Sequence, residues 1–226
     1  MDDAILTTRT LSFLDPKAEP REVDLTIFKP VQNEYSQWKV AYILGPPFWP
    51  KVRYGSSDNI PVAFIYALWV VSAYLRGTQH YAHLHWQGNI DCGLPDSALR
   101  PASWVPPEIP PPEPNPGDLE VFSSSTVSYP DEAGAISTLP FTVFMPKQSE
   151  DGRWNCGVTF GSSLSSPIYY GVGEDFIEAF LDAAAMARVI YDSKLPAGWK
   201  PAEGTGCEYL PFKVGRSYYL DECSAR

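Results

Sequence analysis

All three histidines of this chain lie close together, and histidine is a side chain that binds zinc and transfers protons near neutral pH. His83 and His85 are two residues apart, so on a strand they would point to the same face. His80 precedes them, and Asp91 and Cys92 follow after a turn. Imidazole and thiolate groups are good zinc ligands, so His83, His85 and Cys92 could form a metal site. The alternative is that this side of the strand simply faces solvent.

Cys92 beside His83 or His85 could also act as a nucleophile with its base. Such pairs normally include a third group that orients the base, and no spacing in the chain indicates one. The motifs G-x-S-x-G, H-E-x-x-H and G-x-G-x-x-G are absent from the sequence as well. We therefore expect a protein that is not an enzyme and that needs no cofactor.

A second group of candidate residues is acidic. Glu174, Glu178 and Asp182 recur at every fourth position, so on a helix they form one row of carboxylates. This row and the neighbouring Tyr169 predict a surface that binds the Lys and Arg side chains of a protein partner. The alternative is an ordinary solvated helix face.

Composition narrows the classes of partner and the compartment. The chain has 226 residues and a net charge of −10, which argues against nucleic acid and anionic membranes as partners. The N-terminus has no apolar signal segment, and the most apolar stretch, residues 60–75, is shorter than a bilayer span. The four cysteines include no C-x-x-C pair, which favours reduced thiols. These features predict a cytoplasmic location.

The candidate residues belong to a duplicated scaffold. At an offset of 116 residues, residues 25–75 align without a gap on residues 141–191. Self-similarity at a fixed offset is the signature of a tandem repeat. We expect a first repeat at residues 8–98, a proline-rich linker at 99–118, a second repeat at 119–218 and a tail at 219–226. The shared residues include Trp38/Trp154, Phe28/Phe144, Gln32/Gln148, Gly55/Gly171, Phe64/Phe180, Ala63/Ala179 and Ala67/Ala183.

Both repeats predict the same order of elements. Alternating apolar residues and turn signals predict an α+β fold in which each repeat is an antiparallel sheet with one packed helix. Ser57 or Asp58 would cap the first helix, and Glu174 and Asp175 would complement the dipole of the second. The first repeat should contain strands at 10–14, 22–28, 38–44, 52–54 and 81–86 and a helix at 60–75; the second should contain strands at 154–160, 168–170 and 207–213.

The two helices are expected to differ in burial. The first is apolar on nearly all sides, so it should contact the other repeat or a second copy of the chain, as in a homodimer. The second has its acidic row on one face, which predicts that this face is exposed to solvent. Trp38, Trp154, Phe64 and Phe180 are expected in the two cores because they recur at inward positions.

A Trp-headed strand, a Tyr-Gly strand end and a Gly-x-x-Asp/Glu helix start occur in both repeats. These residues are Trp38, Tyr54-Gly55 and Asp58 in the first, and Trp154, Tyr170-Gly171 and Glu174 in the second. The pattern resembles small bacterial domains of unknown function. Similar acidic proteins act as immunity proteins of contact-dependent and type VI secretion systems, so the resemblance implies a toxin-binding role and no catalytic residues.

The leading hypothesis is therefore an immunity protein that binds and neutralises a cognate bacterial toxin. Acidic residues would steer the protein towards a basic active-site cleft of the toxin. The alternative function is a metal- or ligand-binding module that uses the strand containing His83 and His85.

Overall fold

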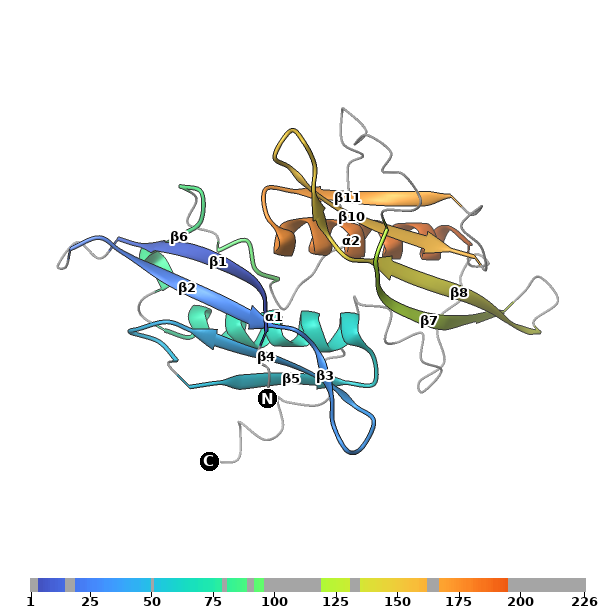
Figure 1. The fold of residues 1–226 in the computed structure, drawn as a ribbon, viewed down its shortest axis with the longest axis horizontal. Helices are drawn as coiled ribbons and strands as arrows, with labels where there is room; N and C mark the ends of the chain where they lie inside the picture. The colour runs from blue at the N-terminus through green and yellow to red at the C-terminus, as the bar shows by residue number, and fades with distance from the viewer. Residues whose placement is uncertain are drawn as a thin grey trace.

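The computed structural model describes residues 4–14, 19–49, 51–78, 81–88, 92–95, 119–130, 135–161 and 167–194. Figure 1 shows two units side by side, each with a helix lying across one face of a twisted sheet. The expected linker at 99–118, the strand at 207–213, the tail at 219–226 and the side chains of His80 and Asp91 lie outside the described residues.

Unit one is an antiparallel sheet with one long helix. The sheet has the order β5-β4-β2-β1-β6, and β3 pairs with the end of β4. Alternate residues of β1 and β2 are buried, as expected for a sheet with one face against a core. The elements are β1 (Ile5–Phe13), β2 (Arg21–Phe28), β3 (Val31–Gln32), β4 (Trp38–Leu44), β5 (Arg53–Ser57), α1 (Ile60–Arg76), η1 (Tyr81–His83) and β6 (Leu84–His85).

Unit two repeats this arrangement. Its sheet has the order β11-β10-β8-β7, and β9 pairs with the end of β10. The predicted α+β fold with one antiparallel sheet and one packed helix in each repeat is therefore confirmed. The elements are β7 (Val121–Pro130), β8 (Ile136–Phe144), β9 (Lys147–Gln148), β10 (Trp154–Phe160), β11 (Ile168–Gly173) and α2 (Phe176–Lys194).

The 116-residue offset extends to local irregularities. The pairing of β1 with β2 shifts between Ile5 and Thr7, and that of β7 with β8 shifts between Val121 and Ser123. In the turns, Gln32 donates to the Ser36 carbonyl at 2.9 Å, and its counterpart Gln148 donates to the Gly152 carbonyl at 2.8 Å. The shared glutamines are thus explained by the turn that each one stabilises.

The shared Gly and Ala residues form the contact between helix and sheet. A Cβ added at Gly55 would collide with the backbone of Ala63 and Ala67 in α1. A Cβ at the equivalent Gly171 would collide with Ala183 and with the carbonyl of Ala179. The absence of a side chain on the strand lets the helix approach it closely, so only glycine fits both positions.

Three local expectations are corrected. Trp38 and Trp154 occupy equivalent strand starts, but both are half-buried at the edge of the core rather than inside it. The N-cap of α1 is Asn59, not Ser57 or Asp58, because the Asn59 side chain accepts from the Val62 N–H at 2.9 Å. The strand expected at 81–86 is only two residues long, since a 3₁₀ turn occupies its first half.

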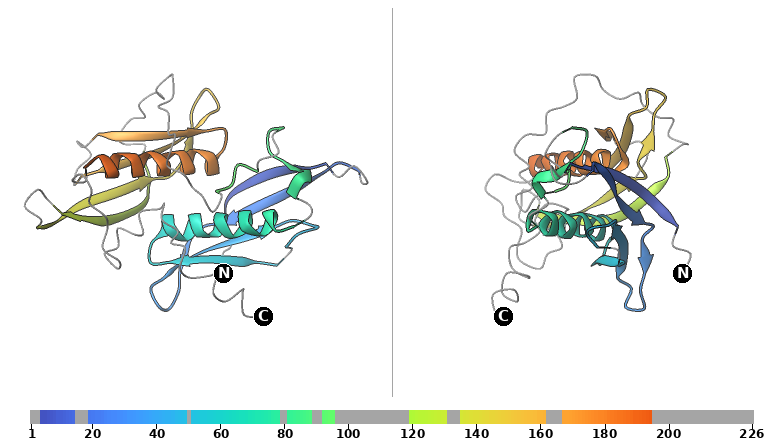
Figure 2. Two further views of the ribbon diagram at one scale, coloured as in Figure 1. Left: turned by 180° about the vertical axis from the view of Figure 1, so that it is seen from behind. Right: turned by 90° about the vertical axis from the view of Figure 1, so that its left-hand side faces the viewer.

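One core spans both units. Phe64 of α1 and Phe180 of α2 are equivalent residues of the two repeats, and their ring centroids are 4.7 Å apart. Phe64 also contacts Phe122 of β7 at 6.2 Å and Phe176 of α2 at 5.9 Å. Contact between equivalent residues is typical of an approximate two-fold relation, as in a dimer interface. The two helices lie side by side, on the same side of the two sheets (Figure 2).

These contacts confirm that α1 is covered by its own sheet and by the other unit. Val70 and Trp69 are both half-buried, so neither is fully open to solvent. Among the described residues, no helix is long and apolar enough to cross a lipid bilayer.

Candidate functional site

A buried arginine connects the two units. Arg9 lies on β1, in phase with the buried Leu11 and Phe13, and its own side chain has no solvent exposure. Its Nε and Nη2 donate to the two carboxylate oxygens of Asp175 at the start of α2, each at 2.6 Å. This bidentate geometry is the strongest form of an Arg–carboxylate interaction.

The remaining side of the guanidinium is held by the segment after β6. Nη1 donates to the carbonyl oxygens of Cys92 at 2.9 Å and Gly93 at 2.6 Å. The indole of Trp86 stacks on the guanidinium, with the Arg9 Cζ 4.0 Å from the ring centroid. Gly93 has φ of +59°, and a Cβ there would collide with both Trp86 and Arg9. Glycine is therefore required where the chain wraps around the arginine.

The ion pair occurs on only one side of the approximate two-fold relation. At the 116-residue offset, Ser125 replaces Arg9 and Asn59 replaces Asp175. Both Asn59 and Asp175 cap a helix, but only Asp175 also binds a cation of the other unit. This difference shows that the two repeats have diverged at the junction.

The acidic residues at the start of α2 form a capping arrangement. The Glu178 N–H donates to Asp175 Oδ1 at 2.8 Å, and the Glu174 N–H donates to Glu178 Oε2 at 2.7 Å. Both bonds satisfy N–H groups that have no partner within the helix. Burial raises the pKa of Glu178; the nearby Asp175 and Glu174 also raise it, whereas the Glu174 N–H and Arg9 lower it.

Asp182 is bound to the neighbouring strand rather than pointing freely into water. Its Oδ2 accepts from the Val172 N–H of β11 at 2.9 Å, so the carboxylate covers a backbone donor of this strand. Glu178 and Asp182 are half-buried, and Glu174 is exposed. The prediction that this face of α2 is exposed to solvent is thus wrong in part, because two of its three carboxylates accept hydrogen bonds from backbone N–H groups.

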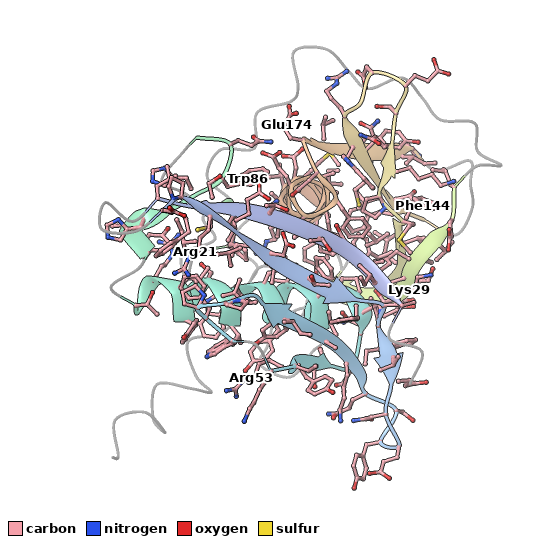
Figure 3. The ribbon with its side chains drawn as sticks, turned by 60° about the vertical axis from the view of Figure 1, so that its left-hand side comes forward. Arg21, Lys29, Arg53, Trp86, Phe144 and Glu174 are labelled. Carbon is pink, nitrogen blue, oxygen red and sulfur yellow. The ribbon has the colours of Figure 1, made fainter. Side chains whose placement is uncertain are left out.

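Glu174, Glu178 and Asp182 nevertheless follow one another along β11, and we call this row the acidic edge. Tyr169 lies on the same strand, half-buried against the core. Glu174 stands at the exposed start of α2 (Figure 3). The row is therefore a partly exposed surface whose carboxylates are fixed in place by backbone hydrogen bonds.

The histidine segment differs in form from the strand that would present the alternative metal site. His83 lies in the 3₁₀ turn with its ring edge-on to Phe13 at 6.2 Å, and His85 lies on β6 paired with Ser12. Cys92 is buried and contributes its carbonyl oxygen to Arg9. Within the part of the chain that the structure describes, no three His, Cys, Asp or Glu side chains are grouped as a metal site would require.

The structure brings residues next to both candidate sets to one junction, although His83 and His85 themselves contact Phe13 and Ser12 instead. Asp175 at the start of α2 binds Arg9 on one side, and Trp86 and the carbonyl oxygens of Cys92 and Gly93 contact it elsewhere, a site that sequence reasoning overlooked. A signal was present, because Arg9 interrupts the buried positions of β1 in phase with Leu11 and Phe13. A charged residue at an inward strand position implies a buried partner.

Comparison with known proteins gives no match: no family model, no curated protein and no solved structure is similar enough to this chain to be informative.

Proposed function

We propose that the chain is a cytoplasmic immunity protein that binds and neutralises a cognate bacterial toxin of a contact-dependent or type VI secretion system. The observation that carries the proposal is the acidic edge, in which Glu174, Glu178 and Asp182 lie along one strand and one helix. Carboxylates already held in place lose little conformational entropy when they bind a cation, so the surface is preorganised for a basic partner.

The distribution of charge along the chain also favours the second unit as the binding site for a basic partner. Residues 119–226 contain 14 acidic and 8 basic residues, net −6, and residues 1–118 contain 13 and 9, net −4. An acidic surface accelerates encounter with a basic cleft and discriminates against acidic proteins. Tyr169, at the far end of the same strand, would supply an aromatic contact beside the charged row.

The test begins with the toxin gene that neighbours this gene in the native genome. Cells that express the toxin should grow only when the chain is also expressed, and the two purified proteins should form a complex. Failure of both the growth rescue and the complex would reject the proposal.

The acidic edge is then tested with changes that keep its hydrogen bonds. Glu174→Gln, Glu178→Gln and Asp182→Asn remove charge but retain an acceptor oxygen at each position. The triple variant should bind the toxin about tenfold more slowly at low salt, with a smaller change at high salt. The matched control neutralises Glu34, Glu150 and Asp24, which are exposed elsewhere. An equal effect of both triple variants would reject this surface as the binding site.

A further inference from the structure

The outer edge strands of the two units, β5 and β11, are equivalent but differ in how their backbone is covered. On β11, Asp182 accepts from the Val172 N–H. At the same offset in unit one, Ser56 replaces Val172 and Tyr66 replaces Asp182, so no carboxylate is present there. Within the described residues, β5 pairs only with β4. An edge strand without such a cover is a template for pairing with another strand.

The helix row beside this strand has changed in the same way. Val62 and Tyr66 of α1 stand where Glu178 and Asp182 stand in α2. Tyr66 stacks on Trp69, with ring centroids 6.0 Å apart, and all three apolar residues are half-buried. Of the three carboxylates along β11, the first has a counterpart beside β5, since Asp58 stands at the position of Glu174, whereas apolar and aromatic side chains replace the other two.

Basic residues gather beside β5, in a chain whose net charge is −10. Lys39, Lys51 and Arg53 lie on or next to this strand, and Asp58 follows its end. The Arg53 guanidinium lies over Trp49 at 5.0 Å, and the Lys39 ammonium lies 5.9 Å from the ring centroid of Tyr54. Figure 3 shows Arg53 projecting from the sheet.

Two apolar residues of this surface are unusually open. Tyr54 is 48% exposed and Val52 is 43% exposed. Each has a basic residue beside it, since Lys51 and Arg53 flank Val52 and Arg53 precedes Tyr54 in the chain. Exposed apolar side chains next to unpaired backbone groups are the features that bind an added strand.

We propose that the edge of β5 binds an extended, acidic segment of another protein, which adds to the sheet of unit one as a further strand. Backbone hydrogen bonds to β5 would supply affinity, and Lys39, Lys51 and Arg53 would select acidic side chains. A second copy of the chain is the competing occupant of this edge, and the oligomeric state of the unliganded chain distinguishes it from an added acidic segment. The proposal does not depend on the toxin hypothesis, which concerns the acidic edge of unit two.

The test selects ligands from a phage-displayed library of random linear peptides against the full chain. Enriched peptides should be acidic and should bind at least about tenfold more weakly to Arg53→Glu. They should also bind at least about tenfold more weakly to Ser56→Pro, which removes a backbone donor of the edge. Lys29→Glu makes the same charge change at an exposed position just after β2 and should leave binding unchanged.

A second variant covers the case in which Ser56→Pro does not fold. Tyr66→Asp places a carboxylate where Asp182 stands in unit two and should block the edge in the same way. The proposal is overturned if the library yields no specific peptide, if the selected peptides are not acidic, or if folded Ser56→Pro and Tyr66→Asp still bind them. A dimer of the unliganded chain that Ser56→Pro abolishes would also overturn it, because a second copy would then occupy the edge.

Discussion

Replacing Arg9 by Met should destabilise the protein more than any other single change of a charged residue at the junction. Met matches the aliphatic stem of arginine but removes the guanidinium. The change breaks the bidentate bond to Asp175 and leaves the carbonyl oxygens of Cys92 and Gly93 without their donor. Removing one partner of a buried ion pair costs about 3–5 kcal/mol.

This free energy translates into a measurable shift in melting temperature. For a chain of this size, each kcal/mol lowers the midpoint by roughly 2–4 °C, so Arg9→Met should melt roughly 10 °C lower. Calorimetry and urea denaturation should both detect the loss. Arg21→Met is the matched control, because Arg21 is exposed and lies over the Phe13 ring at 4.8 Å. The control should lose less than about 1 kcal/mol.

A double-mutant cycle isolates the ion pair. Asp175→Asn should retain the helix cap, as Asn59 does in unit one, but it loses the charge that faces Arg9. If the pair is responsible, Arg9→Met and Asp175→Asn together should cost less than the sum of the single changes by at least about 1 kcal/mol. Additive single effects, or a cost below about 1 kcal/mol for Arg9→Met, would refute the assignment of Arg9 as the connection between the units.

Three further outcomes are expected. Gly171→Ala should destabilise unit two by about 3 kcal/mol or more in urea denaturation, because its Cβ collides with the α2 backbone, whereas Gly45→Ala meets only ordinary contacts and should change stability little. Phe64→Ala and Phe180→Ala should each cost about 3–5 kcal/mol in the same assay, and unequal losses would argue against a shared junction core. Burial raises the pKa of Glu178 above its usual 4.5, so the folded state binds more protons than the unfolded state. The wild type should therefore lose stability relative to Glu178→Gln as the pH rises from 4.5 through the raised pKa of the folded protein. A stability difference that does not depend on pH would contradict burial as the cause.

The sequence predicted the repeated scaffold well because its signals are local. The alternating burial along β2 follows from the order of neighbouring residues. The shared glycine before each helix follows from a single contact between the strand and the helix. These patterns recur at a fixed offset, so each copy supported the assignment of the other. The short β6 was predicted less well, since a six-residue apolar alternation does not distinguish a strand from a 3₁₀ turn followed by a strand end.

The burial of individual side chains was harder to predict. The acidic row of α2 has the spacing of a solvated helix face, yet Asp182 turns towards β11 and binds its backbone. Spacing along a helix identifies which residues share a face, but the position of the neighbouring strand determines whether that face is open.

The sequence by itself determined that the protein consists of two α+β repeats and that its acidic and basic residues are unevenly distributed. Only the tertiary structure decided that Arg9 binds Asp175, a residue 166 positions away, and that one edge strand is covered by a carboxylate while its counterpart is not. The periodicity of apolar residues indicates which face of each segment packs against the core of its own unit. Contacts between the units depend on how the surfaces of the two folded units pack together, and no local sequence pattern encodes that arrangement.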